Sequence, residues 1–287
     1  MSQIILSADS TCDLGTTLKE DYNVHYFPYH IILEDKEYLD NVDITPEDIY
    51  KAYYERKVLP KTSAINVEEY INYLKVFTDE GHEVVHFNLG SALSSSYQNC
   101  KLAAEELPGV YPINSCSLST GIGLQVLDAA DMIIAGKSAK EIYDALHEST
   151  EQYHASFILN TLTFLHAGGR CSSVAKLGAN LLSLKPCIEV DNTTGGMNVG
   201  KKYRGNLEKV LVRYVKDKLQ QYPDIVTNRI FITHSTIEQK YIDIVKETIN
   251  SVMHFDNIYV TKASCTISSH CGPGTLGILF KTKTKSK

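Results

Sequence analysis

Three consecutive serines, Ser94, Ser95 and Ser96, lie where a strand-like run gives way to a helical pattern. The run at 84–89 has the length and composition of a strand buried on both faces, and the pattern after it predicts a helix over about 95–107. The start of a helix offers unpaired N–H groups and a partial positive charge, and serine hydroxyls add donors that rotate toward an oxygen ligand. We interpret this turn as an anion-binding site; the alternative is that one serine simply caps the helix.

Three further polar clusters could contribute to such a site: Thr62-Ser63, Gly168-Gly169-Arg170, and His270 with the Cys-Gly-Pro-Gly turn that follows it. An arginine after two glycines is suggestive, because the bare backbone lets its planar five-donor fork reach past the chain. Each cluster also has an ordinary structural explanation, namely a polar helix entry, a helix end and a hydrogen-bonded histidine. None of the clusters identifies a function by itself.

The elements that must position these residues change character along the chain. From residue 4 to about residue 155, short apolar strands alternate with amphipathic helices, which is typical of a parallel sheet covered by helices. After that point, two strand-like runs flank the turn-rich segment 191–196 and predict an antiparallel hairpin. We therefore predict an α/β protein of two domains: an N-terminal α/β domain with a parallel sheet (1–155) and a C-terminal α/β domain with antiparallel strands (156–287).

Local sequence signals predict where several helices begin. Thr45 before Pro46 predicts a capped helix start, and Asn66 with Glu69 three residues later resembles a capping box. Gly121 and Gly123 lie early in a predicted helix, where they predict close approach of a neighbour. The predicted helices cover about 45–57, 66–80, 95–107, 118–135, 207–220 and 237–252, and the predicted strands of the second half cover about 187–190, 197–202, 229–234, 257–260 and 276–280.

Composition argues against several classes of protein. With 287 residues, 43% of them hydrophobic, the chain can bury a sizeable core. A formal net charge of −6 argues against a dedicated nucleic-acid surface. The sequence shows no signal-type start and no apolar run near the roughly 20 residues of a membrane helix, so we predict a cytoplasmic protein without a membrane-spanning segment. Seven scattered cysteines, never spaced Cys-x-x-Cys, indicate neither a disulfide framework nor a zinc site, and we expect most of them to be small buried side chains.

Taken together, the polar clusters resemble the DegV family of bacterial fatty-acid-binding proteins from end to end. The similarity rests on the order and spacing of segments at 9–14, 62–63, 93–98, 115–123, 168–170, 185–186, 200–205 and 270–274. This chain departs from the usual family pattern at Ser95, where glycine is common, at Ala64-Ile65 after the Thr-Ser pair, and at Asn114.

The resemblance implies a protein that holds one long-chain fatty acid between its two domains and needs no metal or other cofactor. By position, Thr62 and Ser94 match the hydroxyls that bind the carboxylate, with Ser95 and Ser96 beside them, and Arg170 and His270 match motif positions near the head group. Such a protein has no catalytic residue of its own. It presents the acid to a separate ATP-dependent fatty acid kinase, whose acyl phosphate product serves phospholipid synthesis.

Two enzyme classes compete with this interpretation. A serine hydrolase acting on acyl substrates would use a serine at 94–96 with His270, but the turn lacks the Gly-x-Ser-x-Gly elbow and no acidic partner for the histidine is evident. A phosphotransferase would use Asp9 after the first strand, although Asp9-Ser10-Thr11 is also an ordinary turn. Since no Walker loop occurs, we predict that the chain alone does not bind ATP.

Overall fold

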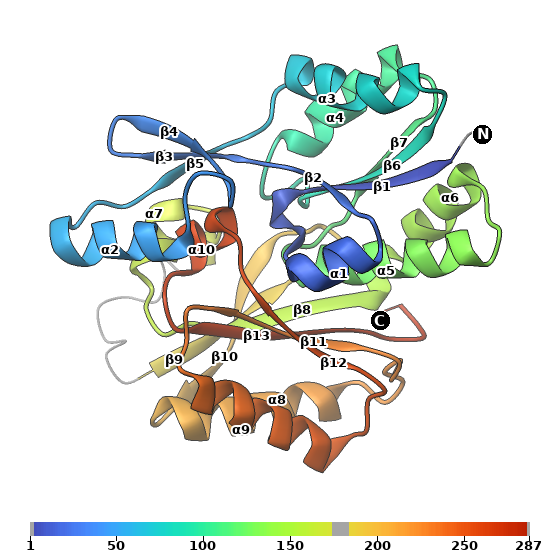
Figure 1. The fold of residues 1–287 in the computed structure, drawn as a ribbon. Coiled ribbons are helices and arrows are strands. Elements are labelled where there is room, and N and C mark those ends of the chain that lie inside the picture. Colours follow the sequence, from blue (N-terminus) through green and yellow to red (C-terminus); the bar gives the residue numbers. More distant parts are fainter. Residues whose placement is uncertain (1–2, 174–183, 286–287) are drawn as a thin grey trace.

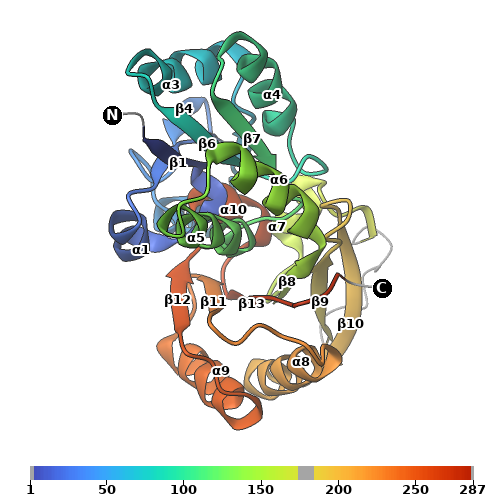
Figure 2. The ribbon, with the colours of Figure 1, turned by 90° about the vertical axis from the view of Figure 1, so that its right-hand side faces the viewer.

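The computed structural model describes residues 3–173 and 184–285, in which a parallel and a mainly antiparallel sheet are stacked with helices between them (Figure 1). Helix α5 (Thr120–Ile134) contacts strands of both sheets, and α10 (Cys265–Cys271) lies in the same layer between the sheets (Figure 2). The predicted α/β class is confirmed. The layered arrangement places the polar clusters of distant segments near one another in the middle of the molecule.

The parallel sheet has the strand order β2-β1-β6-β7, and every neighbouring pair is parallel. Its central strands are almost entirely buried, since helices cover both faces, and this burial accounts for their apolar composition. Parallel strands end at one common edge, so the turns after β6 and β7 meet there. The strands are β1 (Ile4–Asp9), β2 (His25–Phe27), β6 (Glu83–Asn88) and β7 (Val110–Asn114).

A second, three-stranded antiparallel sheet was not predicted. It has the order β4-β3-β5, with β3 (His30–Leu33), β4 (Lys36–Leu39) and β5 (Lys61–Ser63). Strands of three or four residues give too short an alternation to be read from a sequence. This sheet matters for the site because Thr62 pairs with Ile31 and so lies in a strand rather than at a helix entry.

The larger sheet has six strands in the order β10-β9-β8-β13-β11-β12, antiparallel except for the pair β11 and β12. The predicted hairpin is confirmed, with Val190 opposite Met197. Helices α8 (Leu207–Gln221) and α9 (Gln239–Val252) cover the outer face of this sheet (Figure 2). Its strands are β8 (Tyr153–Ile158), β9 (Leu184–Val190), β10 (Met197–Arg204), β11 (Ile230–Ser235), β12 (Ile258–Lys262) and β13 (Thr275–Lys281).

The long helices lie close to their predicted positions. The capping box of Asn66 and Glu69 is present at α3, and Thr45 caps α2 with Asp48 as its reciprocal partner. The helices at the predicted positions are α2 (Pro46–Arg56), α3 (Val67–Asp79), α4 (Ser96–Glu106), α5, α8 (Leu207–Gln221) and α9 (Gln239–Val252). The sequence did not single out α1 (Gly15–Asp21), α6 (Ala139–Ser149), α7 (Thr163–Gly168) and α10.

Close packing explains the two glycines of α5. A Cβ at Gly123 would lie 2.7 Å from Leu14 Cδ2, and one at Gly121 would collide with the Ser117 side chain. The prediction of a close neighbour is therefore confirmed. All seven cysteines are buried free thiols, so burial extends to every one of them rather than to most. Among the described residues, no helix is both long and apolar enough to cross a membrane.

The two halves of the chain are joined by hydrogen bonds at the N-terminus of α10. Asp40 accepts bonds from the N–H groups of Cys265 and Thr266, and Asp13 accepts one from the N–H of Ser264. Both carboxyl groups are buried, and burial raises the pKa of Asp13 to about 8. A C-terminal helix is thus anchored on N-terminal segments. The division at residue 155 falls inside β8, two residues after the strand begins, and the domain limits remain a prediction.

Candidate functional site

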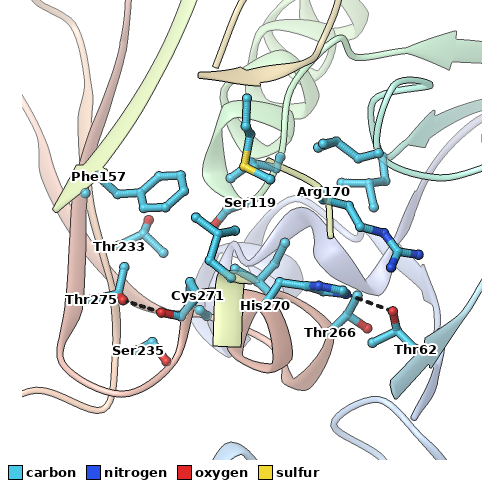
Figure 3. Close-up of a pocket in the computed structure, with 18 of the residues that line it drawn as sticks. Thr62, Ser119, Phe157, Arg170, Thr233, Ser235, Thr266, His270, Cys271 and Thr275 are labelled. Carbon is cyan, nitrogen blue, oxygen red and sulfur yellow. Dashed lines mark hydrogen bonds between the residues drawn. The ribbon is translucent and has the colours of Figure 1, made fainter. Parts of the chain in front are cut away.

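One large pocket lies between the carboxyl edge of the parallel sheet, β5, α10 and the inner face of the six-stranded sheet. It contains about 990 Å³ of empty space, with the solvent at its mouth included. Most of its wall is apolar, and two sets of polar side chains lie at opposite sides of it, one with Thr62 and His270 and the other with Thr233, Ser235 and Thr275 (Figure 3). The apolar wall includes Leu89, Leu93, Leu118, Phe157, Met197 and Leu279.

We call the first polar place the head end, made of Thr62, Ser94, Tyr29 and His270. Thr62 Oγ1 lies 2.9 Å from His270 Nε2, a contact between segments 208 residues apart (Figure 3). Strand β5 fixes Thr62, and α10 presents His270 from its last turn. Gly168 permits this placement, because a side chain there would collide with the histidine ring. Two of the sequence clusters, at Thr62 and His270, are therefore in direct contact.

The electrostatics of His270 make Thr62 a donor. Burial lowers the pKa of His270 to about 4, with a further contribution from the positive charge of Arg170, so the ring is neutral at pH 7. Nδ1 is buried and has no hydrogen-bond partner among the described residues, so a proton there would be an unsatisfied donor. An unprotonated Nδ1 is equally without a partner among these residues, so burial alone does not choose the tautomer; we assign the proton to Nε2, which then donates to Thr62 Oγ1. The Thr62 hydroxyl then directs its own hydrogen toward another acceptor.

The serine turn contributes Ser94 to the head end. Ser94 Oγ accepts a bond of 3.2 Å from the N–H of Ser96 and one of 3.0 Å from the Tyr29 hydroxyl, and donates to Ser96 Oγ at 3.1 Å. Ser95 also lines the pocket, but its side chain caps no helix N–H. Its φ of −78° is ordinary for an L-residue, so serine in place of the family's glycine causes no backbone strain here.

Ser96 and Arg170 stand apart from the head end in different ways. Ser96 is fully buried, accepts a bond of 3.2 Å from the N–H of Ile65 and does not line the pocket. It therefore supports the wall behind Ser94. Arg170 is exposed at the pocket rim, on the same side as Thr62 and His270 (Figure 3), and donates to the carbonyl of Gly168 at 2.6 Å.

The second polar place, which we call the far wall, consists of Thr233, Ser235 and Thr275. Sequence analysis did not find it. Its hydroxyls have partners inside the protein: Thr233 bonds Thr120 at 2.6 Å, Thr275 donates to the carbonyl of Cys271 at 2.9 Å, and Ser235 bonds Ser268 at 3.1 Å. Because these polar groups are already paired, the far wall behaves as part of the apolar lining.

Tyr29 is the head-end residue that sequence analysis missed. It follows β2 by two residues and has no polar cluster around it in the sequence. Its hydroxyl meets Ser94 only because the chain segments at 29 and 94 fold onto the same edge of the parallel sheet.

The geometry disfavours both enzyme alternatives. Ser94 bonds Tyr29 and Ser96, whereas His270 bonds Thr62 and has no acidic partner among the described residues, so no serine–histidine–acid relay is formed. Asp9 is fully buried and accepts bonds from Tyr70, His86 and the N–H of Leu89, which leaves no approach for a phosphoryl group. Within residues 3–173 and 184–285, no group of three or more His, Cys, Asp or Glu is placed to hold a metal ion.

Comparison with known proteins agrees with this architecture. A DegV domain-containing protein of Clostridium perfringens is 29% identical, with 99% of each chain covered. A solved DegV family protein of Thermus thermophilus, described as fatty acid binding, is 26% identical with a TM-score of 0.87, covering 98% of this chain and 99% of that one. A Thermotoga maritima protein whose structure is described as revealing a fatty acid binding function is 25% identical, with a TM-score of 0.84 and 98% and 100% coverage.

The family model described as an uncharacterised protein of the DegV family matches residues 3–283, nearly the whole chain. The match extends across the segments that form the head end and the far wall. The chain belongs to the DegV family.

Proposed function

We propose that this protein binds one long-chain fatty acid, with the tail in the apolar part of the pocket and the carboxylate at the head end. The observation that carries the proposal is the position of the donors. The Thr62 and Ser94 hydroxyls and the Arg170 guanidinium lie at one end of the pocket, whereas the far-wall hydroxyls and those of Ser119, Ser156 and Thr266 are paired inside the protein. Two relatives of the same fold, at 25–26% identity, are described as fatty acid binding.

Order-of-magnitude free energies show how much the tail and the carboxylate each contribute to binding. Burying about 15 methylenes at roughly 0.8 kcal/mol each gives on the order of 12 kcal/mol of gross driving force, before the costs of association. Hydrogen bonds to a charged group contribute about 1.5–3 kcal/mol each. The tail therefore provides most of the affinity, and the two hydroxyls determine which end of the acid faces the mouth.

We further propose that the bound acid is the substrate of a separate ATP-dependent kinase. A carboxylate oxygen would attack the γ-phosphorus of ATP held by that partner, ADP would leave, and the product would be an acyl phosphate for phospholipid synthesis. Neutral hydroxyls suit this role because they orient the carboxylate without the tight bidentate pairing of an arginine. The protein itself would supply no nucleophile, and the cytoplasm remains its predicted location.

Mass spectrometry of a solvent extract of the purified protein tests the binding proposal. We expect one fatty acid per chain, and a delipidated sample should bind added palmitate. A protein that yields no fatty acid and binds none when it is offered would contradict the proposal. A fluorophosphonate probe tests the hydrolase alternative in parallel, since stoichiometric labelling of a serine would favour an enzyme.

The kinase role has its own test. The loaded protein is mixed with ATP and a candidate kinase, and acyl phosphate is trapped with hydroxylamine as the hydroxamate. Thr62→Val combined with Ser94→Ala should reduce product formation even when the fatty acid concentration is raised until the variant is fully loaded. Unchanged turnover of the loaded variant would show that these hydroxyls do not present the carboxylate.

A further inference from the structure

The side chain of Tyr29 is held in one position behind Ser94. The residue is 2% exposed, and its own N–H donates to Ser10 Oγ at 3.1 Å, while Ser10 donates to the buried Asp40 at 2.8 Å. The phenol hydroxyl donates to Ser94 Oγ at 3.0 Å. The ring thus reaches the pocket wall on an anchored backbone, and its hydroxyl is directed at one of the two head-end hydroxyls.

A hydroxyl oxygen accepts two hydrogen bonds and donates one. Ser94 accepts one bond from Tyr29 and a second from the N–H of Ser96, so its acceptor capacity is used up. Only its hydrogen remains, and this now points at Ser96 Oγ, 3.1 Å away. A ligand oxygen that approaches beside Ser96 Oγ can share or take over this hydrogen in nearly its present direction, so that both accepted bonds are kept.

We propose that Tyr29 is a positioning residue that makes Ser94 an obligate donor and thereby selects head groups that only accept hydrogen bonds. The proposal rests on the proposed function, and it specifies why a carboxylate is preferred to a long-chain alcohol. A carboxylate brings only acceptor oxygens, which match the Ser94 hydrogen. An alcohol brings a hydrogen of its own, and Ser94 has no lone pair left to receive it.

The surroundings of Tyr29 keep its phenol protonated, as this role requires. Burial, followed by the nearby charge of Asp9, raises the pKa of the Tyr29 hydroxyl well above its usual range. The Asp9 carboxylate itself accepts hydrogen bonds from the hydroxyl of Tyr70 and the imidazole of His86. The proton of Tyr29 is therefore present throughout the physiological pH range.

Tyr29→Phe removes the donor and keeps the ring. In delipidated protein, we expect the dissociation constant for palmitate to rise about tenfold, because the Ser94 hydroxyl loses its fixed orientation. The dissociation constant for hexadecan-1-ol should stay within about twofold, because the freed lone pair of Ser94 can accept the alcohol hydrogen. The matched control is Tyr73→Phe, which removes a partly buried phenol hydroxyl that is bonded to Ser7 and does not line the pocket; both constants should then equal those of the original protein.

A double-mutant cycle separates positioning from general loosening of the pocket. If Tyr29 acts through Ser94, Tyr29→Phe should cause no further loss of palmitate affinity in a Ser94→Ala background. Equal losses for acid and alcohol, or additive losses in the double variant, would overturn the role of Tyr29 while leaving fatty acid binding intact. A failure of the original protein to bind palmitate would instead remove the proposed function and this inference together.

Discussion

The head end and the far wall of the pocket both carry threonine and serine hydroxyls but differ in what those hydroxyls can offer a ligand. At the head end, the histidine assigned as a donor leaves the Thr62 hydrogen available, and the two groups that donate to Ser94 leave its hydrogen, now on Ser96 Oγ, as the one group it can offer a ligand. At the far wall, the hydroxyls of Thr233, Ser235 and Thr275 are engaged with Thr120, Tyr50, Ser268 and the Cys271 carbonyl.

The comparison shows that the hydrogen-bond partners of a hydroxyl inside the protein, rather than the hydroxyl alone, decide whether that part of the pocket wall is polar. A threonine whose oxygen is paired inside the protein shows mainly its methyl group to the cavity, and a buried polar group with a partner gains little from a ligand. A single pocket can therefore be lined with hydroxyls at both places and still give a fatty acid one defined orientation.

Removing the head-end hydroxyls should produce the largest effect. Thr62→Val with Ser94→Ala deletes two hydrogen bonds to a charged group, worth about 2 kcal/mol each, so we expect palmitate affinity to fall about 1,000-fold. Titration calorimetry of delipidated protein measures the change. A loss below about threefold would mean that the carboxylate binds elsewhere and that the two ends of the pocket do not differ as described.

The sequence predicts much of the framework on which this difference depends. The capping box of Asn66 and Glu69 and the hairpin turn at 191–196 are local signals, and both are present in the structure. The long helices follow from the periodicity of apolar residues, and tertiary contacts do not override it.

The partners inside the site were beyond the reach of sequence patterns. Tyr29 and Ser94 are 65 residues apart, and Thr62 and His270 are 208 apart, so neither pairing leaves a local signal. The elements that hold Thr62 and His270 are also short, since β5 has three residues and α10 has seven. The resemblance to a family supplied the positions of Thr62, Ser94 and His270, but the paired state of the Thr233 hydroxyl had to come from the structure.

The neutral state of His270 predicts a pH dependence. The pKa of His270 is about 4 in the folded protein, because of burial first and Arg170 second, and near 6.5 in the unfolded chain. Between these values the unfolded state binds more protons, so the histidine lowers stability as the pH falls from 6.5 to 4, by at most about 3 kcal/mol. His270→Gln should remove this loss, measured as the difference in urea unfolding free energy between the two proteins across this pH range.

The difference between the two proteins is the relevant quantity, because other groups titrate as well. Burial raises the pKa of Asp13 to about 8, which gives stability the opposite slope, and lowers that of His154 to about 4, which gives the same slope. Both contributions cancel when the variant is subtracted from the original protein. The exposed His254 provides a control, since His254→Gln should leave the curve unchanged. A pH-independent difference for His270→Gln would mean that the ring is not held neutral.

A substitution in the far wall tests whether its hydroxyls contact the ligand. Thr233→Val keeps the shape of the side chain but leaves the buried hydroxyls of Thr120 and Thr261 without their shared partner. We expect the free energy of unfolding to fall by about 1–2 kcal/mol and palmitate affinity to change less than twofold. A large loss of affinity with unchanged stability would show instead that the far-wall hydroxyl contacts the ligand.

The smallest effect is expected at Ser95, which lines the pocket beside Ser94 but belongs functionally to neither polar place. Its φ of −78° is allowed for any residue, its side chain caps no helix N–H, and it is exposed. Ser95→Gly restores the family's usual residue without relieving strain, so we expect the free energy of unfolding to change by less than about 0.5 kcal/mol and palmitate affinity by less than twofold. A tenfold change in affinity would place Ser95 at the head end and would show that its hydroxyl, as well as that of Ser94, contacts the carboxylate.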